Sequence, residues 1–232
     1  MAKKKYKVLD LFCGCGGISE GYALAGFDIA GGIDFNEYAT ITFQHNFKKA
    51  KVHNIDITTF PDSQIEEEYG DVDVIVGGPP CQGFSSANRW QKEMEDPRNK
   101  LFFEYIRFVQ KIHPKVIMIE NVRGLLTRDN GYAIERIKEI LGDEEYNITY
   151  QVLDASEYGV PQNRKRAIIV GVRKDYKDIK FEFSKIEKQE KTTVEDAIGE
   201  LYCFEQSQDG VKQISTPADT QLRKFLRTKD NS

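Results

Sequence analysis

The chain has 232 residues, of which 40% are apolar and 30% charged, and its formal net charge is −4. This composition is typical of a globular domain with a sizeable core, and it argues against nucleic-acid binding by bulk positive charge. No apolar stretch reaches the ~18–20 residues of a bilayer-spanning helix. The lysine-rich amino terminus also lacks the apolar region of a signal peptide. We therefore expect a cytoplasmic protein with no membrane partner.

Strand-like and helix-like segments alternate along most of the chain. Short β-branched runs predict strands at residues 8–12, 29–34, 72–76, 116–119, 149–153 and 167–172. Helical periodicity predicts helices at residues 18–25, 37–46, 101–112 and 132–141. This alternation predicts an α/β fold with a doubly wound, mostly parallel sheet. The last two strands have no obvious helix between them, which predicts an antiparallel pair at one edge.

The character of the chain changes after Arg173. Residues 174–191 are rich in charge with little periodicity, residues 194–201 predict a short helix, and residues 205–221 are polar. We therefore predict one domain over residues 1–175, followed by a linker and the start of a further region over residues 176–232.

A glycine-rich turn follows the first predicted strand at residues 13–17. Such a turn lets a ligand approach the backbone at a helix amino terminus. Asp34, at the end of the next strand, lies 20 positions after Gly14 and suits a ribose diol. Asp56 follows a third strand end and could bind an exocyclic amine. The pattern predicts an adenosine pocket without a pyrophosphate site, and the alternative is an ordinary turn with helix-capping acids.

The strand predicted at residues 72–76 ends abruptly at Gly77-Gly78-Pro79-Pro80, and the next residue is Cys81. Proline has no amide donor and glycine tolerates unusual dihedrals, so the strand must stop there. The thiol is thereby delivered to the carboxyl edge of the sheet, where open α/β folds bind their ligands. This position predicts a nucleophile, although a lone cysteine can also be a small buried hydrophobe.

Two further clusters are predicted close to the same edge. Glu120 ends the next strand, and partial burial would let it donate a proton or a hydrogen bond near neutrality. Arg164 and Arg166 alternate before the last strand, so they share one face of an extended chain. Their planar groups suit a phosphate or a base edge. The alternatives are a capping glutamate and basic residues that flank an apolar strand.

The four cysteines, at positions 13, 15, 81 and 203, fit neither a disulfide framework nor a paired zinc motif. We expect a reducing compartment and no metal.

Together these motifs resemble the DNA cytosine-5 methyltransferase family. The resemblance rests, in chain order, on Phe12-x-Gly14-x-Gly16-Gly17, Pro80-Cys81-Gln82, Glu120-Asn121-Val122 and Gln162-x-Arg164-x-Arg166. The segments around residues 83–85 and 96–99 are similar to bacterial modification enzymes rather than to the tRNA-methylating branch. The resemblance implies the Rossmann-like fold of methyltransferases that use S-adenosylmethionine.

The resemblance also implies a mechanism. Cys81 would attack ring carbon 6 of a cytosine flipped out of double-stranded DNA, and Glu120 would hold or protonate ring nitrogen 3. One of Arg164 and Arg166 would hold the ring oxygen of the base, and the other a phosphate or Glu120. Carbon 5 would then be methylated, with S-adenosylhomocysteine as the second product. Cationic neighbours are expected to lower the pKa of Cys81 from about 8.5.

The resemblance places a loop that closes over the flipped base at residues 84–99. It lines the cofactor pocket with Phe12, Gly14, Cys15, Gly17, Asp34, Phe35, Asp56, Ile57, Gly78, Pro80 and Leu101.

The family continues into a target-recognition domain and two closing motifs that these 232 residues do not contain. We therefore expect either a truncated chain or a second polypeptide that supplies the missing part. The resemblance implies DNA methylation in a restriction-modification system. The alternatives are a tRNA cytosine-5 methyltransferase and a catalytically silent subunit that binds S-adenosylmethionine.

Overall fold

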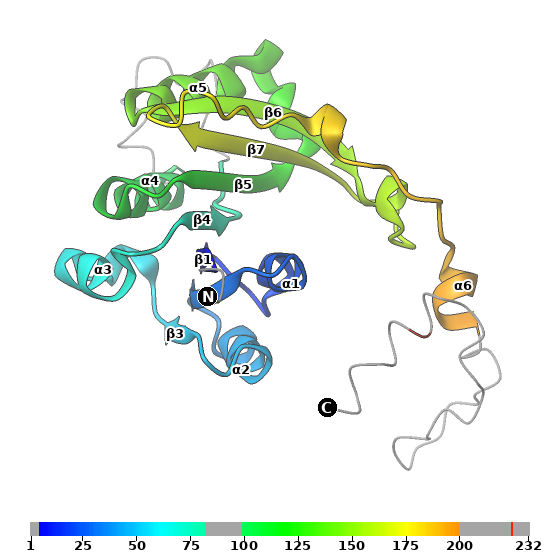
Figure 1. Cartoon of the computed structure of the whole chain (residues 1–232), viewed down its shortest axis with the longest axis horizontal. Helices are drawn as coiled ribbons and strands as arrows, with labels where there is room; N and C mark the ends of the chain where they lie inside the picture. The colour runs from blue at the N-terminus through cyan, green and yellow to red at the C-terminus, as the bar shows by residue number, and fades with distance from the viewer. Residues whose placement is uncertain (1–4, 82–98, 200–223, 225–232) are drawn as a thin grey trace. The chain divides into compact units, whose positions relative to one another are not determined.

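A seven-stranded sheet forms the centre of the protein in a computed structural model that describes residues 5–81, 99–199 and 224. The strands lie in the order β3-β2-β1-β4-β5-β7-β6 (Figure 1). Their bounds are β1 Lys7–Leu11, β2 Asp28–Asp34, β3 Lys51–Asn54, β4 Val74–Gly77, β5 Val116–Val122, β6 Tyr146–Asp154 and β7 Lys165–Arg173. The first five strands in this order are parallel, and β7 runs antiparallel to β5. The predicted mostly parallel α/β sheet is confirmed.

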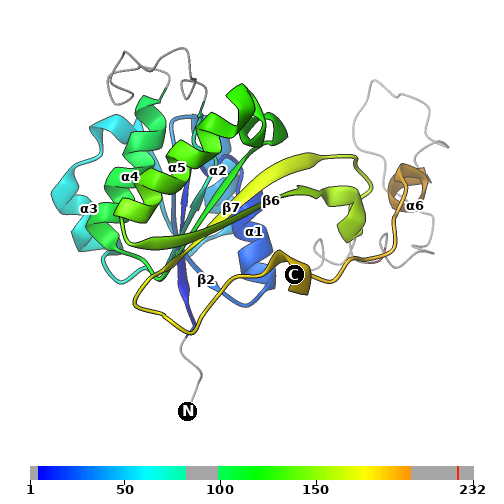
Figure 2. The ribbon, with the colours of Figure 1, turned by 90° about the horizontal axis from the view of Figure 1, so that it is seen from above.

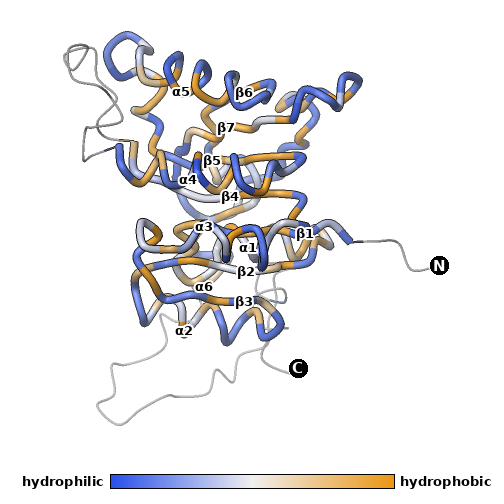
Figure 3. The backbone as a smooth tube through the Cα atoms, turned by 90° about the vertical axis from the view of Figure 1, so that its left-hand side faces the viewer, coloured by the Kyte–Doolittle hydropathy of each residue, from blue (hydrophilic) through white to orange (hydrophobic). Residues whose placement is uncertain are grey.

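Helices cover both faces of this sheet, as doubly wound topology requires. The α-helices are α1 Gly17–Leu24, α2 Glu37–Asn46, α3 Asp62–Tyr69, α4 Lys100–Ile112, α5 Tyr132–Asp143 and α6 Val194–Ile198. Short 3-10 turns are η1 Ile57–Thr59, η4 Arg123–Leu126, η5 Arg128–Gly131, η6 Ala155–Tyr158 and η7 Phe183–Lys185. Helices α1 and α2 lie on one side of the sheet, and α3, α4 and α5 on the other (Figures 1 and 2). Hydrophobic colouring follows the central strands in Figure 3.

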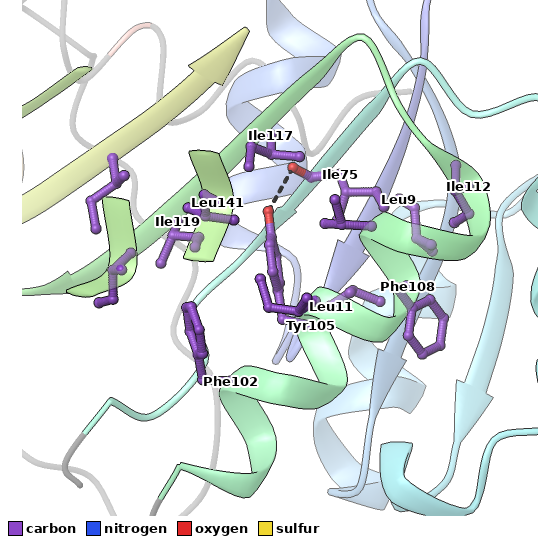
Figure 4. Close-up of a cluster of buried hydrophobic side chains, with 14 of the residues drawn as sticks. Leu9, Leu11, Ile75, Phe102, Tyr105, Phe108, Ile112, Ile117, Ile119 and Leu141 are labelled. Atoms are coloured by element: carbon purple, nitrogen blue, oxygen red, sulfur yellow. Dashed lines mark hydrogen bonds between the residues drawn. The ribbon is translucent and has the colours of Figure 1, made fainter. Parts of the chain in front are cut away.

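Helix α4 supplies much of the larger core. Its apolar side recurs at helical spacing, and Phe102, Tyr105 and Phe108 are fully buried against the sheet (Figure 4). The buried Tyr105 hydroxyl donates to the Ile75 carbonyl at 3.1 Å, which satisfies a polar group that would be costly to leave alone. The helix is therefore fixed firmly against the face of the sheet.

Two elements differ from the predictions. Helix α3 was not predicted, and β3 was expected only as the strand end before Asp56, because each carries too few apolar residues to show periodicity. In α3 only Ile65 and Tyr69 are buried, one helical turn apart among acidic residues. Strand β3 has no fully buried residue. Short elements at the edge of a sheet need little apolar surface, so their sequences carry a weak signal.

The chain divides into two compact units. The first comprises Met1–Val152 and Arg166–Phe183, and the second comprises Leu153–Lys165 and Ser184–Ser232. Within the second unit, the Thr192 hydroxyl donates to the Gly159 carbonyl at 2.8 Å, and Thr193 with Asp196 forms a capping box at the start of α6. None of the helices in the described part of the chain is long and apolar enough to cross a bilayer.

Candidate active site

The glycine turn leaves β1 through an unusual backbone path. Phe12, Gly14 and Gly16 have φ values of 61°, 53° and 95°, all in the left-handed region. A non-glycine residue there costs roughly 1–3 kcal/mol and is often found at functional sites. The Gly14 amide donates to Asp34 Oδ2 at 2.8 Å, which ties the turn to the end of β2. The backbone conformation of the turn is therefore stabilised by its contact with the end of β2 and not only by the conformational preferences of its own residues.

A cavity of about 400 Å³ lies beside this turn, within the range of small-molecule sites. Its lining residues are Phe12, Ile33, Asp34, Phe35, Ile55, Asp56, Ile57, Gly78, Pro80 and Leu101. Gly14, Cys15 and Gly17, which were expected in the pocket, do not line the cavity. Ile33 and Ile55 line it and were not expected. The predicted pocket residues from four strand ends and α4 thus lie around one cavity.

Two carboxylates stand at the rim of this cavity. Asp34 also accepts from the Asn36 amide through Oδ1 at 2.9 Å, in addition to its contact with the turn. Asp56 Oδ1 accepts from the Thr58 amide at 2.9 Å, and the backbone and side-chain hydrogen bonds from Thr58 hold the pKa of Asp56 below its usual value. Both acids therefore have a structural role, and both keep lone pairs that can face the cavity.

Arg107 supports the cavity from α4, a role that the sequence did not suggest. Its guanidinium donates to the Ile57 carbonyl at 2.8 Å and to the Phe60 carbonyl at 3.0 Å. It also forms an ion pair with Asp62 at 2.5 Å. Because Ile57 lines the cavity, these contacts fix one of its walls.

Cys81 lies directly after Pro80, which lines the cavity, and its side chain is only 4% exposed. The thiol donates to the Pro79 carbonyl at 3.3 Å. The same carbonyl accepts from Asn121 Nδ2 at 2.8 Å, and Asn121 also hydrogen-bonds the thiol. Asn121, at the end of β5, therefore fixes the turn that carries Cys81. It was named in a motif but not expected to act.

The expected lowering of the Cys81 pKa is wrong for this state of the protein. Burial raises the pKa of Cys81 to about 12, because a thiolate loses its hydration in the apolar surroundings. The positive charge of Arg128 and the hydrogen bond from Asn121 oppose this effect without overcoming it. The sequence contains the cationic residues, but it does not show how deeply the Cys81 thiol is buried.

Glu120 lies on β5 next to the cysteine turn. Its Oε1 accepts from Arg166 Nε at 2.9 Å, across the β5–β7 pairing. Gly78, which lines the cavity, is so close that a Cβ built there would lie 3.6 Å from Glu120 Oε2. A carboxylate thus lies close to Gly78, which lines the cavity, and a guanidinium orients it.

The two arginines have different surroundings. Arg166 belongs to the first unit and contacts Glu120, as one of the two expected assignments requires. Arg164 belongs to the second unit, where its carbonyl accepts from the Ala155 amide at 3.0 Å. The expected closing loop at residues 84–99 lies almost wholly outside the described residues. Within residues 5–81, 99–199 and 224, no cluster of His, Cys, Asp and Glu is arranged to hold a metal ion.

The chain is similar to known proteins over most of its length. Residues 6–229 match the family model described as C-5 cytosine-specific DNA methylase. The type II methyltransferase M.DdeI of Desulfomicrobium norvegicum is 39% identical, over 89% of this chain and 51% of its own length. M.NgoPII of Neisseria gonorrhoeae is 36% identical, over 84% of this chain and 57% of its own length. The chain therefore spans about half the length of the curated relatives that it matches.

Solved structures show the same architecture. A DNA modification methyltransferase encoded within an E. coli prophage superposes with a TM-score of 0.70 at 29% identity, over 85% of this chain and 55% of that one. The Dnmt2 methyltransferase of S. pombe superposes with a TM-score of 0.60 over 84% of this chain and 54% of that one, and at 24% identity it supports the fold alone. With its fold and its family match in agreement, this chain belongs to the C-5 cytosine-specific DNA methylase family.

Proposed function

We propose that the chain transfers a methyl group from S-adenosylmethionine to carbon 5 of cytosine in DNA. One observation carries this proposal: a single short segment, residues 78–81, lines the cavity, carries Cys81 and lies against Glu120. Gly78 and Pro80 line the cavity, Cys81 follows them, and Gly78 lies against Glu120. Family membership supports the same chemistry, and the type II relatives favour a role in DNA modification.

The cavity suits S-adenosylmethionine. Its apolar walls, which include Phe12 and Leu101, can hold an adenine ring. Asp34 is placed to accept hydrogen bonds from a ribose diol, and Asp56 from an exocyclic amine. When bound, this cofactor supplies an electrophilic methyl group on a cationic sulfur. The other expected pocket residues, Gly14, Cys15 and Gly17, would contribute the turn that holds the cofactor's end.

The protein's own residues perform the remaining steps. The Cys81 thiolate adds to carbon 6 of cytosine, forming a C–S bond and shifting electron density to carbon 5. Glu120, held by Arg166 through Oε1 and carrying a proton in this step, donates that proton to ring nitrogen 3 and so compensates the charge that develops on the ring. After carbon 5 has taken the methyl group, loss of its proton and cleavage of the C–S bond release the thiolate.

The substrate is double-stranded DNA whose target cytosine is flipped out of the stack, since Cys81 cannot reach carbon 6 within a duplex. We propose that residues 1–175 form the catalytic and cofactor-binding domain and that residues 176–232 begin the target-recognition region. The curated relatives are about twice as long as the segment that they share with this chain.

Covalent trapping tests the proposed reaction. The chain is incubated with S-adenosylmethionine and duplex DNA that contains 5-fluorocytosine, whose fluorine blocks the final elimination. We expect an adduct that mass spectrometry maps to Cys81. A preference for 5-fluorocytosine in tRNA would replace DNA by RNA as the substrate. A chain that binds S-adenosylhomocysteine but forms neither adduct would be a silent subunit, and the proposed activity would be wrong.

Replacing Asp34 by asparagine should weaken the binding of S-adenosylhomocysteine about tenfold, as measured by isothermal titration calorimetry. The substitution removes the charge that strengthens hydrogen bonds to ribose hydroxyls, and it places an amide against the donors at Gly14 and Asn36. Asp28→Asn is the matched control, because Asp28 is exposed at the start of the same strand. Equal affinities of the Asp34 and Asp28 variants would contradict the assignment of the ribose site.

A further inference from the structure

One wall of the cofactor cavity comes from a very short element. Asp56 and Ile57 line the cavity, and they stand at the start of the 3-10 turn η1. Within this turn the Thr59 amide donates to the Asp56 carbonyl at 2.9 Å, and the Phe60 amide donates to the Ile57 carbonyl at 3.2 Å. A 3-10 turn has poor hydrogen-bond geometry and little stability of its own. The turn therefore depends on contacts from outside for its position.

Arg107 of α4 supplies such contacts. Nη2 of its guanidinium donates to the Ile57 carbonyl at 2.8 Å, and Nη1 donates to the Phe60 carbonyl at 3.0 Å. Because these carbonyls belong to the first residue and the capping residue of η1, one rigid planar group bridges the whole turn. The Arg107 side chain is only 23% exposed, and Glu104 accepts from its Nε at 2.7 Å, so the guanidinium is itself fixed.

The same turn places the Asp56 carboxylate. Asp56 Oδ1 accepts from the Thr58 amide at 2.9 Å, so the side chain of Asp56 follows the backbone of η1. An ionised carboxylate only accepts hydrogen bonds, and at the edge of a base it favours a donor such as an amino group. A shift of the turn would therefore carry this acceptor away from its place at the cavity.

We propose that Arg107 is a positioning residue that makes the cavity selective for adenine over purines without a 6-amino group. This inference rests on the proposed binding of an S-adenosyl cofactor in the cavity. The guanidinium fixes η1, the backbone of η1 fixes the Asp56 carboxylate, and the carboxylate accepts from the exocyclic amine. A hydrogen bond to a charged acceptor discriminates strongly between ligands only where that acceptor is held in place.

The affinities of two ligands, measured by isothermal titration calorimetry on the full chain, test the inference. One ligand is S-adenosylhomocysteine, and the other is its 6-deamino analogue, in which purine replaces adenine. We expect the wild type to bind the analogue about 20-fold more weakly, and we expect Arg107→Gln to reduce this ratio of affinities to about threefold. A general packing defect would weaken the binding of both ligands equally and leave the ratio unchanged.

Matched variants locate the effect. Lys111→Gln removes a cation that pairs with Asp62 and Glu66 from the next turn of α4, and it should keep the ratio of the wild type. Arg107→Lys keeps the charge but cannot bridge two carbonyls, so its ratio should also fall. This variant decides the test if Arg107→Gln does not fold. In Asp56→Ala the two ligands should already bind about equally, and adding Arg107→Gln should not change their ratio further.

The outcomes separate this inference from the proposed function. A folded Arg107 variant that keeps the ratio of the wild type, or an equal fall of the ratio in Lys111→Gln, would overturn the inference. A wild type that binds both ligands equally would also overturn it, while its binding of S-adenosylhomocysteine would still support the proposed cofactor. A wild type that binds neither ligand would contradict the proposed function, and the inference with it.

Discussion

Replacing Cys81 by alanine is expected to abolish the covalent adduct with 5-fluorocytosine DNA and to lower kcat for methyl transfer by about 10⁴-fold or more. Carbon 5 of cytosine is a poor nucleophile until a thiolate has added to carbon 6, so no other side chain can substitute for the sulfur. The measurements are gel detection of the adduct and transfer of labelled methyl to DNA. Cofactor binding should change little, because Pro80 rather than Cys81 lines the cavity.

Two controls separate chemistry from folding. Cys81→Ser keeps nearly the same volume in a site that is 4% exposed, and it should lose the adduct while retaining cofactor affinity within about threefold. Asp28→Asn changes an exposed residue at the start of β2 and should form the adduct normally. An adduct that survived in Cys81→Ala would show that another group attacks the base, and the proposed mechanism would be wrong.

Features that repeat along the sequence allowed much of the fold to be predicted. The β-branched runs and the apolar stripe of α4 each contain several residues that report the same burial, so the central sheet and its longest helix were found. Helix α3 was missed, and β3 was expected only from the acid at its end, because a short element at the periphery needs few or no fully buried side chains. The missing crossover helix predicted that the last two strands form an antiparallel pair at one edge; β7 and β6 are neighbours at that edge, and β7 runs antiparallel to β5.

The candidate site was predictable only in part. The carboxyl ends of parallel strands meet at one edge, so the convergence of Asp34, Cys81 and Glu120 could be expected from topology. The burial of Cys81 could not, because it depends on side chains that pack from distant segments. Arg107 was missed for a similar reason: an arginine has no sequence signal until the fold shows which carbonyls it faces.

The buried carboxyl group of Asp10, in the middle of the sheet, is expected to make the stability of the protein depend strongly on pH. It lies on β1 with no exposed surface, and Oδ2 accepts from the buried Ser19 hydroxyl at 2.7 Å. Oδ1 has no hydrogen-bond partner in the described structure. Burial, with a smaller contribution from the charge of Asp34, raises the pKa of Asp10 to about 7 from an ordinary value of 3.8. The folded protein therefore holds a proton that the unfolded chain releases above about pH 4.

Stability should fall as the pH rises, because the folded state binds this proton more tightly than the unfolded state. The contribution of Asp10 is fully present below about pH 4 and is lost as the pH passes through about 7. Between pH 5 and pH 8 the free energy of unfolding should fall by about 3 kcal/mol. Over the whole range from below pH 4 to above pH 8 the fall should be about 4 kcal/mol. Urea denaturation of the wild type at a series of pH values measures it.

Asp10→Asn removes this dependence, since an amide does not titrate. The variant should lose about 3 kcal/mol less than the wild type between pH 5 and pH 8, and comparing the two proteins cancels every other titrating group. Ser19→Ala is the matched control. It removes a hydrogen bond that favours the ionised form, so it should raise the pKa of Asp10 further and move the loss of stability to higher pH. If the free energy of unfolding had the same pH dependence in the wild type and in Asp10→Asn, Asp10 would be ionised in the folded protein. The prediction of a neutral Asp10 would then be wrong.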